Sequence, residues 1–247
     1  ANTNNTTAFA GLGYSVENKK DINGHIVLGC SHIYSSNGEG LKYKLAKISN
    51  DKIQWRHKKP HLCYDDAYEF GKSIVNLFYE SMNELPKRVV IHKRTFYTDE
   101  EKQGIIDSIS DNKKIESIDL IEINFENNIK YASSKIHDGK VDIDGFSVSR
   151  GTCIQLSSKE ALLWAHGVIP SVINPNWNFY PGGRYIPKPL RIIKHYGTGS
   201  LEQIANEILG LTKMNWNSLN MYSQLPATIS SSNDIARIGK LIGANSM

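Results

Sequence analysis

Residues 88–101 read RVVIHKRTFYTDEE, and they carry the signals of a buried strand followed directly by a helix. The run Arg88–His92 is nearly all apolar, which is typical of a strand that is covered on both faces. Thr98 and Glu101 have the spacing of a capping box, in which each side chain satisfies a free backbone N–H group of the other residue. The stretch therefore predicts a central strand and a helix that begins after Thr98 and continues through Ile109.

Three strands and a helix are predicted ahead of this stretch. The three strands fall within the segments Thr6–Asn18, His25–Tyr34 and Leu41–Ser49. Short polar turns that contain Asn-Gly separate these segments. Turns of this kind join antiparallel strands, so the segments predict an antiparallel meander. A helix follows, with Asp65 or Asp66 as its cap, because apolar residues recur at steps of three and four until Pro86.

Two strands and another helix are predicted beyond it. Ser117–Asn124 predicts a strand, a polar hairpin-like insert follows, and Ser147–Leu156 predicts another strand. Ser157 or Ser158 then caps a predicted helix, KEALLWAHG, which ends at Gly167. This order predicts an α/β chain of ribonuclease-H-like fold, with a mixed sheet, an antiparallel three-strand meander and helices on both faces.

The composition indicates a globular protein with a sizeable core, since the 247 residues are 40% hydrophobic and 22% charged. No internal repeat or low-complexity linker divides the chain, so we expect one domain. The formal net charge of +4 is compatible with nucleic-acid binding and excludes a disordered polycationic arm. Widely spaced Cys30, Cys63 and Cys153 favour a reducing, cytoplasmic setting over a disulfide framework. No apolar run has the length that spans a bilayer. Because the first residue is Ala1 rather than Met, we expect the chain to be part of a longer protein.

Several segments are similar, in order and spacing, to the PIWI domain of Argonaute proteins. They are RVVIHKRTFYTDEE, SRGTCIQLSSKEALLWAHG, LRIIKHYG with SLEQIANEILGLTKMNWN, and LPATISSSNDIARIG. The chain resembles the short prokaryotic Argonautes most, through IHKRTFYTDEE and LTKMNWN, and the resemblance covers nearly all of it. Those proteins consist of a MID and a PIWI domain. The resemblance therefore implies that residues 1–247 are a PIWI domain and that a MID domain lies before Ala1.

The resemblance also implies where metal ligands would stand. Active PIWI domains hold two divalent metal ions on the scissile phosphate with carboxylates, because hard oxygen ligands suit Mg²⁺ and Mn²⁺. The positions of this sequence that match the ligands are Gly13, Gln155 and Asn233. Glycine offers no ligand and neutral amides lack the charge, while Asp234 lies one residue away from the third position. The resemblance thus implies a catalytically inactive domain, and the alternative is a guide-directed ribonuclease-H-like nuclease with displaced ligands.

A guide strand of RNA or DNA and its paired target are the partners that the resemblance implies. Cations and amides hold a strand through its phosphates and sugars without reading its bases. The candidate contacts are His92, Arg94, Thr95, Arg150, Arg191, Lys194, Lys213, Asn215 and Asn217. A surface salt bridge is the alternative for Arg150, and an exposed charged edge flanking a strand is the alternative for Arg191 and Lys194. An amide-rich helix end is the alternative for residues 211–217.

The resemblance further implies a protein partner. In short Argonautes this partner carries an APAZ region fused to a TIR, sirtuin-like or nuclease effector, which target recognition switches on in defence against invading nucleic acid. The aromatic and proline-rich insert Pro170–Pro189 is the candidate contact surface, and a loop folded back on its own domain is the alternative. We expect no cofactor in this domain; a Mg²⁺ ion at the guide 5′-phosphate is the one exception that the resemblance allows. A third hypothesis is a purely structural protein that binds no nucleic acid.

One further group of side chains suggests a different chemistry. His57, His61, Cys63, Asp65 and Asp66 lie close together in the sequence, and such residues bind zinc. Their spacing is irregular and no second pair of ligands completes the set, which favours a plain polar connection.

Overall fold

A computed structural model of the chain describes residues 6–16, 26–30, 44–48, 53–56, 59–131, 134–143, 148–169, 187–213 and 224–244. The chain forms two compact units. The first unit comprises Ala1–Glu122, Lys194–Gly199 and Ala227–Met247, and the second comprises Ile123–Ile193 and Ser200–Pro226.

The first unit is built on a mixed sheet. Its strands lie in the order β7-β6-β1-β2-β3 and are β1 (Thr7–Val16), β2 (Ile26–Cys30), β3 (Lys44–Ile48), β6 (Arg88–Lys93) and β7 (Ser117–Phe125). β2 pairs antiparallel with both β1 and β3, which confirms the predicted meander. β6 runs parallel to both β1 and β7, so the predicted mixed sheet is also confirmed.

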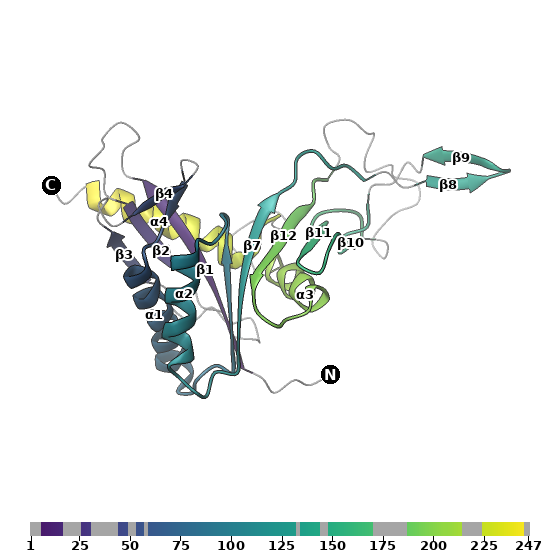
Figure 1. Cartoon of the computed structure of the whole chain (residues 1–247). Coiled ribbons are helices and arrows are strands. Elements are labelled where there is room, and N and C mark those ends of the chain that lie inside the picture. The colour runs from purple at the N-terminus through teal and green to yellow at the C-terminus, as the bar shows by residue number, and fades with distance from the viewer. Residues whose placement is uncertain are drawn as a thin grey trace. The chain divides into compact units, whose positions relative to one another are not determined.

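Helices cover both faces of this sheet, as the sequence predicts. α1 (Tyr64–Met82) and α2 (Asp99–Ser110) pack on one face, and α4 (Ala227–Ala244) packs on the other (Figure 1). Side chains alternate across a strand, so each face of β1 meets a different helix. Leu12 lies in the core with Ile74 of α1, whereas the next residue, Gly13, lies against α4.

The ends of the two helices on the first face follow from local chemistry. Thr98 accepts a hydrogen bond from the backbone N–H of Glu101, and the backbone N–H of Thr98 donates to the Glu101 side chain, so the capping box is confirmed. The cap of α1 is Cys63, two or three residues before the predicted Asp65 or Asp66. Both aspartates lie in the first turn instead, where negative charge stabilises the helix dipole.

The second unit combines a small antiparallel sheet with one helix and a hairpin. The sheet has the order β10-β11-β12, and its strands are β10 (Cys153–Gln155), β11 (Glu160–Leu163) and β12 (Leu190–Tyr196). α3 (Leu201–Leu211) begins at Ser200, whose hydroxyl accepts a hydrogen bond from the Gln203 N–H.

The polar insert predicted as a hairpin forms β8 (Ser134–His137) and β9 (Lys140–Ile143), so this prediction is confirmed. β7 and β12 pass from one unit into the other along the chain. The single domain expected for residues 1–247 stays a prediction.

One predicted helix is wrong. The segment KEALLWAHG, with its cap at Ser157 or Ser158, contains β11 rather than a helix. Ser157 forms the turn between β10 and β11 by accepting a hydrogen bond from the Lys159 N–H. The strand residues Leu162 and Leu163 are buried, and a short apolar run of this kind fits a covered strand as well as a buried helix. The strand predicted over Ser147–Leu156 is reduced to β10, since Gly151 turns the backbone at a φ of 91°.

One hairpin was not predicted. β4 (Gln54–Arg56) and β5 (Lys59–His61) pair antiparallel within a polar segment that has no apolar alternation. Strands of this length carry too few residues for a pattern to emerge.

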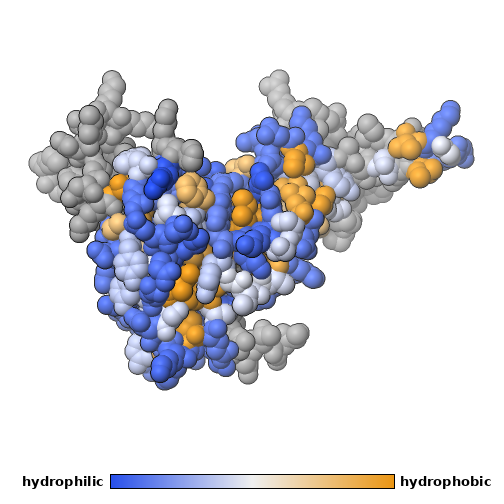
Figure 2. All heavy atoms as spheres, viewed as in Figure 1, coloured by the Kyte–Doolittle hydropathy of each residue, from blue (hydrophilic) through white to orange (hydrophobic). Residues whose placement is uncertain are grey.

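Across the described residues, no helix combines the length and the apolar character that crossing a membrane requires. Figure 2 shows hydrophilic residues over much of the visible face, with apolar residues in separate small groups. One such group lies on the β8–β9 hairpin, where the cross-strand neighbours Ile136 and Val141 are 78% and 70% exposed.

Candidate nucleic-acid interface

The parallel pairing of β1 and β6 brings several predicted site residues to one edge of the first unit's sheet. The register runs from Thr7 opposite Arg88 to Leu12 opposite Lys93, so Arg94 leaves the end of β6 level with Gly13, after which β1 continues to Val16. Ligand sites of open α/β sheets lie outside the carboxyl ends of the strands. We call this region the carboxyl edge; it consists of Gly13, Arg94, Thr95 and the α4 turn Ser232–Asn233.

Gly13 lies directly under α4. A Cβ atom at this position would be 2.8 Å from the backbone carbon of Ser232 and 2.9 Å from its carbonyl oxygen and hydroxyl. Real Cβ atoms do not come this close to backbone, so any side chain here requires α4 to move. Where the resemblance implies an aspartate, the backbone of α4 thus fills the space. Asn233, the next residue of α4, is half-buried, and Asp234 is exposed.

His92 is fully buried beneath the first turn of α4 rather than open to solvent. Its Nδ1 lies 2.8 Å from the Thr228 hydroxyl, and its Nε2 has no hydrogen-bond partner among the described residues. Burial, reinforced by the charge of Arg88, lowers the pKa of His92 to about 3, so the imidazole is neutral at physiological pH. His92 therefore links β6 to α4 inside the protein, and its side chain does not lie on the surface.

Arg94 and Thr95 leave the end of β6 in different environments. The Arg94 side chain is exposed and carries a guanidinium group. Thr95 is half-buried, and its hydroxyl oxygen is buried without a hydrogen-bond partner among the described residues. The carboxyl edge thus presents a cation level with a glycine.

Arg150 and Lys213 come close together in the second unit. Arg150 Nε donates a 2.9 Å hydrogen bond to the Ala165 carbonyl, and Nη2 donates a 2.8 Å bond to the Thr212 hydroxyl. Thr212 is the buried C-cap of α3, and Lys213 follows it on the surface. Arg150 therefore links the Ala165 segment to the end of α3, and neither of these two hydrogen bonds is a salt bridge.

Arg191 and Lys194 lie inside β12, not at its flanks as predicted. Arg191 Nε is 2.5 Å from Glu160 Oε1, and Nη1 is 3.5 Å from Glu126 Oε2. Lys194 Nζ donates a 2.8 Å hydrogen bond to the Gly199 carbonyl. The Arg191 contacts lie within the second unit, and the Lys194 contact lies within the first.

The remaining predicted positions are not brought to the carboxyl edge. Gln155 is exposed on β10 of the second unit, and its amide donates a 3.0 Å hydrogen bond to the Ser157 carbonyl. Asn215, Asn217 and most of the insert Pro170–Pro189 lie outside the described residues.

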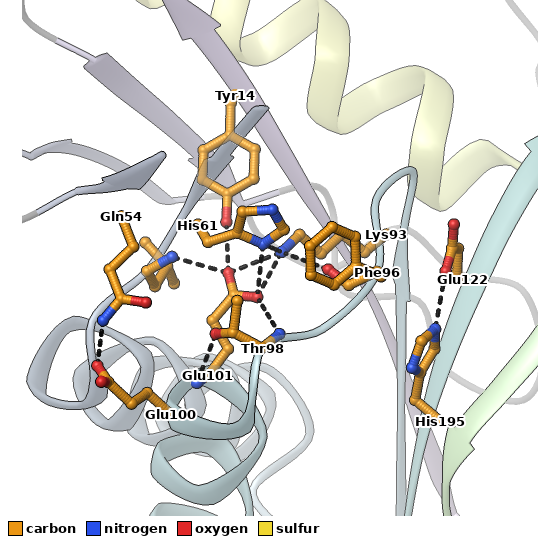
Figure 3. Close-up of polar contacts among 11 residues, drawn as sticks. Tyr14, Gln54, His61, Lys93, Phe96, Thr98, Glu100, Glu101, Glu122 and His195 are labelled. Carbon is orange, nitrogen blue, oxygen red and sulfur yellow. Dashed lines mark hydrogen bonds and ion pairs between the residues drawn. The ribbon is translucent and has the colours of Figure 1, made fainter. Parts of the chain in front are cut away.

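The sequence reasoning missed a buried polar cluster on the α1/α2 face, drawn in Figure 3. Lys93 Nζ lies 2.7 and 2.6 Å from the two carboxylate oxygens of Glu101. His61 Nδ1 is 3.2 Å from both Glu101 Oε2 and Lys93 Nζ, and the Tyr14 hydroxyl donates a 2.9 Å bond to Glu101 Oε1. Lys93, Glu101 and His61 are all fully buried. We call these four residues the Lys93 cluster.

The electrostatics of the Lys93 cluster favour an ion pair. Burial alone raises the pKa of Glu101, but the hydrogen bond with His61 and the charge and bonds of Lys93 outweigh it and lower this pKa. Burial lowers the pKa of Lys93 against the opposing effect of Glu101. Nζ lies within hydrogen-bond distance of both carboxylate oxygens and 5.4 and 5.3 Å from the ring centres of Tyr14 and Tyr97, so we assign both partners as charged.

Three residues of the alternative metal site have other partners or lie close to this cluster. His61 is engaged with Glu101, Cys63 Sγ donates a 3.4 Å hydrogen bond to Asp66, and His57 lies outside the described residues. Within the residues that the structure describes, no three His, Cys, Asp or Glu side chains are grouped to hold a metal ion.

The fold can be compared with known proteins. No protein-family model matches the sequence, and no curated protein matches it. Solved structures do resemble it. Argonaute from A. aeolicus is 19% identical with a TM-score of 0.59, over 94% of this chain and 28% of that one. Clostridium butyricum Argonaute, bound to a guide DNA and a target DNA, is 17% identical with a TM-score of 0.63, over 97% and 28%.

A third structure shares the same likeness. Marinitoga piezophila Argonaute, in complex with a guide RNA and target DNA, is 16% identical with a TM-score of 0.60, over 93% of this chain and 29% of that one. The chain therefore spans less than a third of the length of each of these Argonautes. At these identities the likeness concerns the fold, and the chain has a ribonuclease-H-like, PIWI-like Argonaute fold.

Proposed function

We propose that this chain is the PIWI part of a short prokaryotic Argonaute, which holds a guide strand paired to its target and cuts neither. Two of the similar Argonautes are bound to a guide and a target strand. The match covers at least 93% of this chain, so nearly the whole chain corresponds to a part of those proteins. This supports guide and target strands as its ligands.

The contact between Gly13 and α4 is the observation that carries the proposal of an inactive domain. A metal ligand at Gly13 would need space that the Ser232 backbone occupies. Arg94, at the end of the neighbouring parallel strand, adds a positive charge where divalent cations would need negative ones. A two-metal site does not fit these residues, which leaves binding as the output.

The Gly13 contact can be tested with a matched pair of substitutions. Gly13→Ala should lower the free energy of unfolding by about 1–3 kcal/mol, because the added methyl group overpacks against backbone. Gly210→Ala, in α3 and open to solvent, has nothing within 4 Å of the new Cβ and should raise stability by about 1 kcal/mol. Urea unfolding measures both, and equal effects at the two positions would show that α4 does not close over Gly13.

Cleavage assays separate this proposal from the alternative of a guide-directed nuclease with displaced ligands. With Mg²⁺ or Mn²⁺, purified protein loaded with a guide should leave a labelled target intact. The triple substitution Gly13→Asp, Gln155→Asp and Asn233→Asp should leave it intact as well, because the supporting residues around a metal site are absent. A guide-dependent cut at one fixed phosphate by the unmodified protein would establish the alternative.

The surface contacts that we propose for the strands are Arg94 and Thr95 in the first unit and Lys213 in the second. Each is exposed or half-buried and lies at the end of a strand or helix. His92, Arg150, Arg191 and Lys194 are assigned to supporting these regions, since their described bonds lie within the protein. A gel shift with guide alone and with guide–target duplex, repeated over a range of salt, tests binding. Affinity that is absent, or independent of salt, would favour a purely structural protein.

We further propose that duplex binding is passed to an APAZ-containing effector in the cytoplasm, with a MID domain completing the guide site. A binding event drives a partner only when the duplex favours one of the partner's states by a difference in free energy. The proposal is supported by the combination of a PIWI-like fold and an edge without metal ligands. In this way target recognition would activate a TIR, sirtuin-like or nuclease effector in prokaryotic, antiviral defence.

A further inference from the structure

We infer that the β8–β9 hairpin of the second unit anchors a protein partner through the exposed apolar pair Ile136 and Val141, and that this partner is the effector-bearing protein of the proposed function. The inference rests on the proposed function and adds a surface by which the partner is held. The chemistry that this surface recognises is an apolar pocket on a protein.

Ile136 and Val141 form one continuous apolar contact on the hairpin. They lie directly opposite each other in the register of β8 and β9, so their side chains share a face. They are 78% and 70% exposed, whereas no other large hydrophobic residue that the structure describes is more than 50% exposed. Single exposed apolar side chains are ordinary on a protein surface, but two adjacent ones that are this exposed indicate a contact site.

The turn of the hairpin holds the pair in place. Asp138 and Gly139 form its two-residue loop, with φ values of 50° and 75°. Two positive φ values are those of a type I′ turn, whose twist matches the twist of the flanking strands. The local sequence therefore shapes the hairpin before any partner binds, and a preformed surface loses less conformational entropy on binding.

The hairpin lacks the packing that normally stabilises a small sheet. Among the strands that the structure describes, β8 and β9 pair only with each other. A two-stranded sheet is marginally stable in water unless it packs against a further strand or helix. A partner that covers the face of Ile136 and Val141 would supply this packing.

The charges of the hairpin favour a protein over a nucleic acid or a membrane. The formal charges cancel, since the sequence from Ser134 to Ile143 holds Lys135, Lys140, Asp138 and Asp142. Attraction to a phosphate backbone or to anionic lipids needs an excess of positive charge. The same segment has no aromatic side chain on which a base could stack. The aliphatic pair is therefore suited to an apolar pocket on a protein.

The size of the pair favours a different protein over a second copy of this chain. A stable interface buries about 800 Å² on each partner. Two hairpins that met through this face would bring together only two aliphatic side chains from each copy, which is too little for a dimer. Within a larger interface with an effector, the pair can serve as an anchor, because a few residues carry most of the binding energy.

The test removes the apolar character of the pair and keeps its shape. In the double variant Ile136→Thr with Val141→Thr, both residues stay β-branched, so the strands keep their propensity. Each side chain gains a hydroxyl group that an apolar pocket leaves without a hydrogen bond. The affinity of the full-length protein for the purified APAZ-containing effector is measured by titration calorimetry. It should fall about tenfold for each substitution and about a hundredfold for both.

The neighbouring cross-strand pair provides the matched control. His137 and Lys140 are also opposite each other and exposed, and the alternation of side chains along a strand puts them on the other face of the hairpin. His137→Thr with Lys140→Thr should leave the affinity for the effector unchanged. Both double variants should bind a guide–target duplex as the unmodified protein does and should unfold at the same temperature.

Three outcomes overturn the inference and leave duplex binding as proposed. In the first, the effector binds the unmodified protein and the Ile136→Thr, Val141→Thr variant equally well. In the second, this variant unfolds at a lower temperature in the absence of effector, which would place the face against another part of the same protein. In the third, the unmodified protein sediments as a dimer and the variant as a monomer, which would make the face a contact between copies.

Two further outcomes separate the inference from the proposed function. If the variant binds the duplex more weakly and the effector normally, the face belongs to the nucleic-acid interface and the inference is overturned. If the unmodified protein does not bind the effector at all, the inference falls together with the proposed effector partner, and the gel shift with duplex decides the rest of the proposed function.

Discussion

Lys93 ends β6, whose centre is the apolar run Val89–Ile91, and it is fully buried there. A buried ammonium is tolerated only with a close counter-charge, which Glu101 supplies at 2.6 Å. Glu101 also completes the capping box with Thr98, so one carboxylate serves the start of α2 and the end of β6. Glu101 therefore links the capping box of α2 to the end of β6.

Removing the charge of Glu101 should destabilise the protein strongly. Glu101→Gln leaves Lys93 buried without its partner, which should lower the free energy of unfolding by about 3–5 kcal/mol in urea unfolding. Asp99→Asn is the matched control, since Asp99 is 99% exposed in the same helical turn and pairs with Lys102 on the surface. That control should leave unfolding nearly unchanged. The double variant Lys93→Met with Glu101→Gln should recover part of the loss, and equal effects of Glu101→Gln and Asp99→Asn would refute the ion-pair assignment.

His92 should make stability sensitive to acid. Its pKa falls from 6.5 to about 3 on folding, so between these values the unfolded state binds a proton that the folded state does not. Stability therefore rises with pH through this window and is lost as pH falls below 6.5, by about 2 kcal/mol at pH 5. His92→Asn should remove this component of the slope between pH 7 and pH 5. His137→Asn, at an exposed position, controls for loss of an imidazole, and an unchanged slope in His92→Asn would contradict the burial effect.

At the scale of elements, sequence patterns succeeded where local and long-range signals agree. β1, β6, β7, α1 and α2 all lie where periodicity and capping place them. β11 was predicted as a helix because a short apolar run that follows two serines has no period that distinguishes a helix from a strand, and pairing with β10 and β12 decides between them. The same holds for the candidate site. The predicted end of β6 gave the positions of Arg94 and Thr95 in the fold, but the burial of His92 depends on α4, over a hundred residues away.

The elements of the second unit predict different roles for two neighbouring cations. Arg150→Ala removes the bonds that join Ala165 and the α3 C-cap, and it should lower the free energy of unfolding by about 1–3 kcal/mol. Lys213→Ala, one residue beyond that cap and exposed, should leave stability unchanged and lower the salt slope of duplex binding by about one. Urea unfolding and salt-dependent gel shifts separate the two. A loss of stability in Lys213→Ala, or an unchanged salt slope, would remove Lys213 from the interface.

At the scale of the whole molecule, we propose that the chain signals by binding a guide–target duplex, so the signal depends on the fraction of protein that has duplex bound. The described residues offer cations at strand and helix ends, and the carboxyl edge lacks the acidic groups of a metal site. Effector activation that depends on the bound fraction has a testable property. A higher duplex concentration compensates for a weakened contact with the nucleic acid, but it does not compensate for a weakened contact with the effector.

Effector activation should therefore separate two classes of variant. In a reconstituted complex with the APAZ effector, Arg94→Gln and Lys213→Ala should lower activation at limiting duplex and regain full activation when duplex is raised about tenfold or more, since each loses one phosphate contact. Trp177→Ala and Tyr180→Ala lie in the insert Pro170–Pro189, outside the described residues, and the sequence predicts that they contact the effector. These two should reduce co-purification and stay impaired at saturating duplex. Rescue of the insert variants by duplex would place the insert at the nucleic acid, and full activity of both at every concentration would exclude it from the partner surface.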